Sequence, residues 1–154
     1  MAVWDQQQQV RLATEVRLLQ QEFPHFSFQN HAQAELTCVS GTQTSSASKN
    51  YGLRLWLRTS FPHQMPDLYI TSPTPLYGYA GNTIQSYGTS HAMHVWVPDW
   101  NNYVKICHCK SEYWSASNTI VSVLMKGFLW LEAFEAHCRT GRSIDAYSLT
   151  FGAS

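Results

Sequence analysis

The sequence predicts an α+β domain, and three observations support this prediction. Apolar residues recur at helical spacing over residues 4–23, alternate with polar residues over 51–58, and become almost continuous from Asn118 onward. A chain of 154 residues has the size of one domain, and no internal repeat or shift in composition divides it. We therefore expect a single domain over residues 1–154, built in the order helix, strands, loop and helix.

The first helix is expected over residues 4–23. Pro24 follows this stretch, and a proline just after a periodic pattern is typical of a helix end. Apolar side chains recur at the i, i+4, i+7 and i+11 spacing of one helix face. They are Leu12, Val16, Leu19 and Phe23.

A four-stranded antiparallel meander is expected next, because short loops separate the strand candidates. The clearest strand begins at Tyr51, where apolar residues alternate with polar ones as on a half-buried sheet. Residues 41–50 are small and polar and predict an exposed connection. Residues 72–100 lack sustained periodicity and predict a long irregular region. Such regions in compact domains are often functional. The four strand candidates are residues 26–28, 34–39, 51–57 and 68–71.

The last helix is expected to start near Asn118. Ser117 or Asn118 can cap its first turn, and Gly141 follows its expected end. Its residues are apolar on almost every side, which is typical of a helix in the centre of a domain rather than on its surface.

Charge and cysteine content limit the classes of function. Ten basic and ten acidic side chains give a net charge of zero, which argues against nucleic acid and against anionic membranes as partners. No apolar run reaches the length of about 18 residues that a membrane span needs. We therefore expect a cytoplasmic protein without a cofactor. Its four cysteines are expected to be reduced in that compartment.

Cys107 is the leading candidate for chemistry. Lys105, His108 and Lys110 surround it with polar groups, whereas an inert buried cysteine would stand in a core pattern. A thiolate at this position can attack a carbonyl and carry an acyl group. Cys109 lies on the same face if the segment is extended, so either thiol could be the reactive one.

Metal binding is the alternative use of these cysteines. The Cys-x-Cys pair could ligate a metal together with His91, His94 or His108. Structural zinc sites usually show two cysteine pairs at wider spacing, so the pattern favours thiol chemistry and no metal. A papain-like hydrolase also uses cysteine, histidine and asparagine, but there the cysteine precedes the histidine, and here the order is reversed.

Three polar residues before Cys107 are candidates to support an acyl transfer. His94 can act as a base, as a hydrogen-bond donor to the acyl group, or as a brace for the loop. Asn101 and Asn102 can donate amide hydrogens to a developing oxyanion. The same two asparagines also fit ordinary turn chemistry, which remains the alternative for at least one of them.

Three stretches share a pattern: the step Ile106-Cys107-His108, residues 113–120 (YWSASNTI), and residues 61–71 with their two prolines before a strand. Together they resemble the active-site segment of ubiquitin-conjugating enzymes and the proline-rich turn that precedes it in that family. Residues 128–141 are similar to the prokaryotic branch of that family, which includes the conjugating domains of bacterial anti-phage CBASS operons. The family's His-Pro-Asn motif is absent, and residues 94–96 (HVW) are its nearest counterpart.

The resemblance implies a ubiquitin-conjugating-enzyme-like fold with a long active-site loop and a central C-terminal helix. It also implies that Cys107 carries the C-terminal glycine of a protein as a thioester and transfers it to an acceptor. The cargo would be a cGAS-like nucleotidyltransferase or a ubiquitin-like protein. The chain has no Gly-rich nucleotide loop, so either a separate activating enzyme would load the cargo or the loading route is an unusual one. A non-catalytic protein-binding module on the same scaffold is the alternative.

Overall fold

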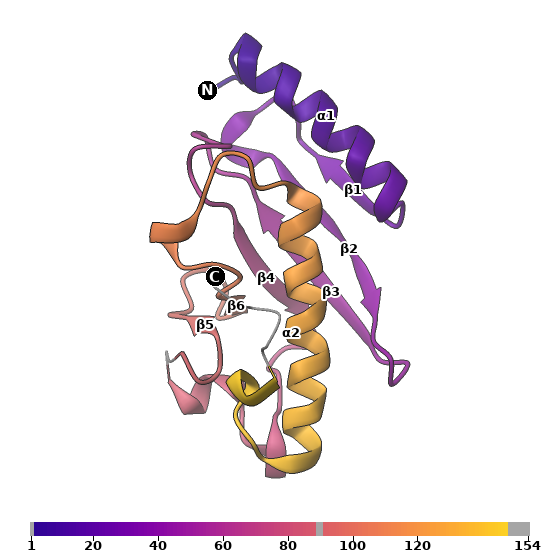
Figure 1. The fold of residues 1–154 in the computed structure, drawn as a ribbon, viewed down its shortest axis with the longest axis vertical. Helices are drawn as coiled ribbons and strands as arrows, with labels where there is room; N and C mark the ends of the chain where they lie inside the picture. The colour runs from indigo at the N-terminus through magenta and orange to yellow at the C-terminus, as the bar shows by residue number, and fades with distance from the viewer. Residues whose placement is uncertain (1, 89–90, 148–154) are drawn as a thin grey trace.

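The computed structural model describes residues 2–88 and 91–147. They form one antiparallel sheet in the order β1-β2-β3-β4-β6-β5, accompanied by the long helices α1 (Gln6–Glu22) and α2 (Ile120–Thr140) (Figure 1). The strands are β1 (Phe26–Gln29), β2 (Cys38–Thr44), β3 (Asn50–Trp56), β4 (Asp67–Ser72), β5 (Val95–Trp96) and β6 (Val104–Ile106). The α+β class is thus confirmed, with six strands where the sequence predicted four.

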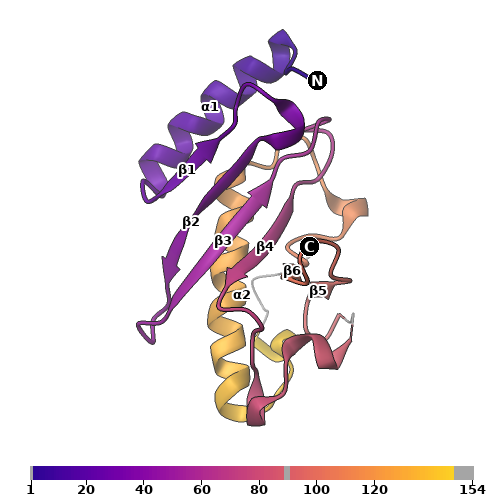
Figure 2. The same cartoon turned by 180° about the vertical axis from the view of Figure 1, so that it is seen from behind.

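Both helices lie on the same side of the sheet. The two opposite views show α2 running along the middle of the sheet and α1 beside the β1 edge, with the other face free of long helices (Figures 1 and 2). The helices contact each other, and an aromatic contact joins them where Phe23, just after α1, meets the ring of Phe128 on α2. The main core therefore fills the layer between the helices and the sheet.

Strand β3 follows the predicted alternation. Tyr51, Leu53 and Leu55 are buried, whereas Arg54 and Trp56 between them are only partly covered. This alternation places the apolar side chains toward α2, because successive side chains of a strand point to opposite faces. A side chain at Gly127 of α2 would collide with Leu68 of β4, so the helix packs closely on the sheet at this point.

The predicted second strand and the connection after it are wrong in their boundaries. Residues 34–36 form a short 3-10 turn, and β2 begins only at Cys38. The strand then continues through Thr44 and pairs with β3 along its whole length, so residues 41–44 belong to a hairpin and not to an exposed connection. The prediction missed these residues because Thr42 and Thr44 are polar and exposed, so this part of the strand shows no alternation of apolar residues.

The region 72–100 is less irregular than predicted. It contains two short 3-10 turns, Tyr79–Gly81 and Ile84–Tyr87, and strand β5 near its end. Strand β5 pairs with β6, and β6 in turn pairs with β4, so the sheet extends two strands beyond the predicted meander. Two and three residues are too few to show an alternation, which explains why the pattern missed both strands.

Helix α2 begins at Ile120 and is capped by Thr119, whose side chain accepts a hydrogen bond from the Ser122 N–H. The cap therefore lies one or two residues after the predicted positions. Gly141 ends the helix in the left-handed conformation with φ of 77°, as the sequence predicted. The helix is central along the sheet, but it remains exposed on its outer side at Met125. Among the described residues, no helix is both long and apolar enough to cross a bilayer.

Candidate functional site

Cys107 lies directly after strand β6, at the end of the hairpin that β5 and β6 form. Its backbone N–H donates a 2.8 Å hydrogen bond to the carbonyl oxygen of His94, which precedes β5. The residue is partly exposed, and the nearest polar partner of its sulfur is the Cys109 carbonyl oxygen at 3.8 Å. The hairpin therefore fixes the backbone of Cys107 and leaves its thiol partly accessible from solvent.

The protonation of Cys107 is set by opposing effects. Burial raises the pKa of the thiol, whereas the backbone at Cys109 and the positive charges of Lys110 and Lys126 act in the opposite direction. Burial prevails, and the pKa lies above its ordinary value. At neutral pH the thiol is therefore the dominant form, and the nucleophilic thiolate is scarcer than in a free cysteine.

Cys107 and Cys109 have different environments. Cys109 is only 3% exposed, and burial raises the pKa of its thiol. The side chain of His108 between them is also buried, and its Nε2 is 2.8 Å from the Pro66 carbonyl oxygen. Of the two thiols that the sequence left open, Cys107 is therefore the more exposed.

His108 is uncharged at neutral pH. Burial lowers the pKa of its imidazole to about 4, against the opposing effect of the hydrogen bond with the Pro66 carbonyl. The Nδ1 atom of the same ring is buried without a hydrogen-bond partner. The imidazole packs edge-on against Trp114. His108 therefore belongs to the packing beneath the loop and does not face the solvent beside the thiol.

The loop between β6 and α2 is braced from two sides. The indole N–H of Trp114 donates to the Pro62 carbonyl oxygen at 2.9 Å, which joins the loop to the turn before β4. The guanidinium of Arg11 on α1 donates to the carbonyl oxygens of Ala116 and Asn118. These contacts hold the segment after Cys107 in one place, as expected for a loop that presents a reactive group.

A buried carboxylate completes the link to α1. Glu15 is fully buried, accepts a hydrogen bond from Arg11 at 2.7 Å, and accepts another from the Ile120 N–H at 2.9 Å. The carboxylate thus satisfies a backbone donor in the first turn of α2, where negative charge is favourable. Arg11 and Glu15 were not among the residues predicted from the sequence, although an oppositely charged pair at i,i+4 spacing on a helix is a recognisable signal.

The imidazole of His94 is directed at a carboxylate. A catalytic group that served Cys107 would be directed at the thiol instead. The ring is buried, and its Nε2 lies 2.7 Å from Oδ1 of Asp145 on the 3-10 turn η5 (Ile144–Tyr147). The backbone of His94 has φ of 51°, in the left-handed region, at the last position of the turn before β5. Of the three roles that the sequence allowed, this geometry favours the brace.

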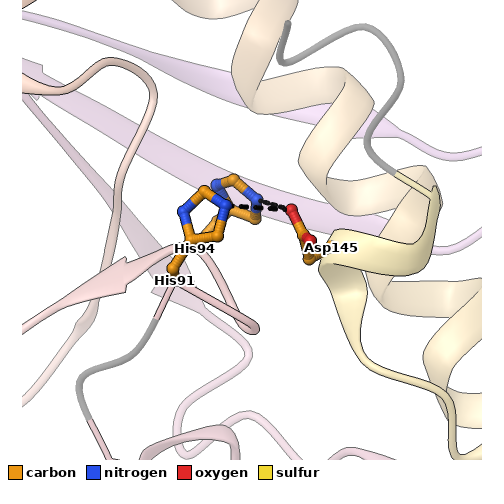
Figure 3. A group of neighbouring side chains, drawn as sticks. All are labelled: His91, His94 and Asp145. Carbon is orange, nitrogen blue, oxygen red and sulfur yellow. Dashed lines mark hydrogen bonds and ion pairs between the residues drawn. The ribbon is translucent and has the colours of Figure 1, made fainter. Parts of the chain in front are cut away.

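Figure 3 shows a third side chain at the same carboxylate. The Nε2 atom of His91 lies 3.3 Å from Oδ1 of Asp145, so both imidazoles approach one oxygen atom. Among the residues that the structure describes, His91, His94 and Asp145 are the group that converges at metal-ligand spacing, and neither cysteine nor His108 belongs to it. The predicted metal alternative built on the Cys-x-Cys pair is therefore not supported by the geometry.

Asn101 and Asn102 occupy the opposite end of the β5–β6 hairpin. Both are exposed, with φ of 47° and 56°, and the turn is closed by a 3.0 Å bond from the Tyr103 N–H to the Trp100 carbonyl oxygen. An extended strand rises about 3.3 Å per residue, so five residues separate Asn102 from Cys107 by roughly 16 Å. The structure does not bring these amides to the thiol, and the turn chemistry explains both residues.

The comparisons with known proteins identify no relative. No family model, no curated protein and no solved structure matches this chain significantly. The residues around Cys107 and their geometry are therefore the basis of the functional proposal.

Proposed function

We propose that the chain is a ubiquitin-conjugating-like acyl transferase of the prokaryotic kind, with Cys107 as the thioester-forming residue. The observation that carries the proposal is a partly exposed thiol at the end of a strand, followed by a loop braced on α1 and on the turn before β4. The order of elements also agrees with the resemblance, since a helix, an antiparallel sheet, a loop and a long helix follow one another.

The proposed reaction consists of two exchanges at one carbonyl carbon. The thiolate of Cys107 attacks the thioester that joins a protein's C-terminal glycine to a separate activating enzyme, and the thiolate of that enzyme leaves. An amine of the acceptor then attacks the Cys107 thioester, loses a proton to solvent, and releases the Cys107 thiolate. No oxidant or reductant takes part. The cargo is a cGAS-like nucleotidyltransferase or a ubiquitin-like protein, in the cytoplasm of a bacterium during anti-phage defence.

The geometry limits which groups can stabilise the oxyanion in these steps. The N–H of Cys107 already donates to the His94 carbonyl oxygen, and the imidazole of His94 is paired with Asp145. In the proposal His94 is therefore a positioning residue that holds the Cys107 backbone. Donors to the oxyanion come from the cargo, from the activating enzyme, or from the loop after Cys107.

The decisive experiment is the trapping of the thioester. The chain is incubated with the activating enzyme, nucleotide and candidate cargo, and its intact mass is measured with and without reductant. We expect an adduct that reductant removes and that Cys107→Ala abolishes. Cys109→Ser is the matched control and should retain the adduct, because that thiol is buried. An adduct that survives in Cys107→Ala, or that needs Cys109, would reject the assignment.

A non-catalytic protein-binding module is the second candidate function. The specific observation in its favour is the pKa of Cys107, which burial raises and which reduces the supply of thiolate. In that case Cys107→Ser would leave partner binding unchanged, and no loading condition would give a thioester. Trapping and binding measurements on the same variant therefore separate the two functions.

A further inference from the structure

A second cluster of chemically reactive side chains lies at the start of the β5–β6 hairpin, next to the strand end that carries Cys107. His91 and His94 come from the segment before β5, and Asp145 comes from η5, about fifty positions further along the chain (Figure 3). Their ligand atoms all lie within 4.8 Å of one another. The acyl transfer proposed for Cys107 uses the backbone carbonyl of His94 but assigns no chemical step to these three side chains.

The backbone around the cluster is held by hydrogen bonds. The Asp145 N–H donates to the Ala92 carbonyl oxygen at 2.8 Å, which fixes η5 against the segment between the two histidines. The His94 N–H donates to the His91 carbonyl oxygen at 3.2 Å and closes a tight turn. The two histidines therefore approach the carboxylate from a common turn, with ring centroids 4.5 Å apart.

The distances are close to those of a metal centre. Zinc binds imidazole nitrogen and carboxylate oxygen at about 2.0–2.2 Å, so neighbouring ligand atoms in a tetrahedral site lie about 3.3–3.5 Å apart. The His91 Nε2 atom lies 3.3 Å from the Asp145 oxygen, which already fits. The 2.7 Å contact of His94 is a direct hydrogen bond, and a small outward movement of the partly exposed Asp145 side chain would admit the ion.

We propose that His91, His94 and Asp145 form a binding site for a divalent transition-metal ion, with zinc as the best-matched ion. Two imidazoles and one carboxylate are the ligand set of transition metals, whereas magnesium and calcium prefer oxygen ligands alone. Three protein ligands leave a fourth position for water. The ion takes the place of the hydrogen between the His94 Nε2 atom and the carboxylate. A neutral imidazole shifts that hydrogen to Nδ1, whereas a doubly protonated imidazole releases one proton to solvent and keeps the other on Nδ1.

The site has a structural consequence for the hairpin. His94 supplies a side-chain ligand and also the carbonyl oxygen that accepts the Cys107 N–H. Asp145 stands next to Ile144, whose side chain is fully buried in the core. A bound ion would therefore join the last turn of the described chain to the strand end that positions Cys107.

Titration of the metal-free chain with Zn²⁺ alone, followed by calorimetry, tests the proposal. We expect one equivalent to bind, and we expect His91→Ala and Asp145→Asn each to weaken binding at least about 10–100-fold, the loss caused by removing even an outer partner of a metal ligand. His91 is 60% exposed, so its removal should leave folding intact. His31→Ala is the matched control, because His31 is exposed and lies far from His91 in the sequence. This variant should bind zinc as the parent does.

Cobalt distinguishes this site from one built on cysteines. Co²⁺ bound by imidazole and carboxylate gives visible absorption without the intense near-ultraviolet band of a thiolate ligand. Cys107→Ser and Cys109→Ser should leave both the spectrum and zinc affinity unchanged, so the result is independent of the acyl-transfer proposal. Three results would each overturn the assignment: zinc affinity in His91→Ala and Asp145→Asn equal to that of the parent, a thiolate band in the cobalt spectrum, or the absence of stoichiometric binding to the parent.

Discussion

The N–H of Cys107 donates to the carbonyl oxygen of His94 over 2.8 Å, while the imidazole of His94 lies against Asp145. His94 thus contacts the backbone of Cys107 through its carbonyl oxygen and the 3-10 turn η5 through its imidazole.

Alkylation of Cys107 should be slower than that of a free cysteine at pH 7. Burial raises the pKa of this thiol, so the thiolate fraction is reduced and the rate should keep rising above about pH 8.5, the ordinary cysteine pKa. Iodoacetamide labelling followed by peptide mass spectrometry measures each cysteine separately. The unfolded chain provides the reference rate. A midpoint for Cys107 below that of the unfolded chain would contradict the prediction.

Arg11→Ala should destabilise the fold by about 3 kcal/mol, the typical cost of breaking a buried ion pair. The variant leaves the Glu15 carboxylate buried without its cation and removes the donor to two carbonyl oxygens of the loop. Urea unfolding at pH 7 measures the loss. Arg17→Ala, at an exposed position of the same helix, is the control and should change little. Equal losses in the two variants would show that the brace is unimportant.

The stability of the chain should fall as the pH decreases from about 6.5 to about 4 because of His108. Burial lowers the pKa of this imidazole in the folded state to about 4, whereas an unfolded histidine has a pKa near 6.5. The contribution of His108 is therefore present above pH 6.5 and is lost as the pH falls toward 4, with a total of about 3 kcal/mol.

Urea unfolding at several pH values, compared between the parent and His108→Gln, isolates this contribution. Glutamine can still donate to the Pro66 carbonyl oxygen, and it does not titrate. We expect a flatter dependence on pH in the variant, whatever its stability at pH 7. Parallel curves for the two proteins would refute the assignment to His108.

Tyr51→Phe should destabilise the fold by about 1.5–3 kcal/mol, the value of a hydrogen bond to a charged group. The hydroxyl of Tyr51 on β3 donates to the buried Glu135 carboxylate of α2 at 2.8 Å, and Ser45 donates to the same oxygen at 2.6 Å. The pKa of Tyr51 is raised, mainly by burial and to a smaller extent by the hydrogen bond to Glu135. Tyr113→Phe, at an exposed tyrosine, is the control in the same unfolding measurement.

The elements that the sequence predicted well are those long enough to show a period. Helix α1 was predicted from the face that contains the buried Leu12 and Leu19, and β3 from alternation that burial confirms. Gly141 marked the end of α2 because a residue without Cβ adopts the left-handed conformation easily. In each case the local pattern and the tertiary packing agree.

The remaining features depend on contacts between distant segments. Strands β5 and β6 are too short for a pattern, and they are strands because the edge of β4 is available for pairing. Asp145 follows His94 by more than fifty positions, and no local signal relates the two. Asn101 and Asn102 were predicted as oxyanion donors because they carry side-chain amides. Their place in a hairpin turn separates them from Cys107. The sequence could therefore indicate the candidate thiol, but it could not indicate which distant residues contact the segment around it.

The sheet ends in short strands at both edges, four residues at β1 and two at β5. Pro24 stands shortly before the first edge and Pro98 shortly after the second. An incoming strand could form few main-chain bonds at either place, and proline has no N–H to offer. We therefore expect a binding partner to contact the side chains and loops of this domain rather than to extend its sheet at these two edges.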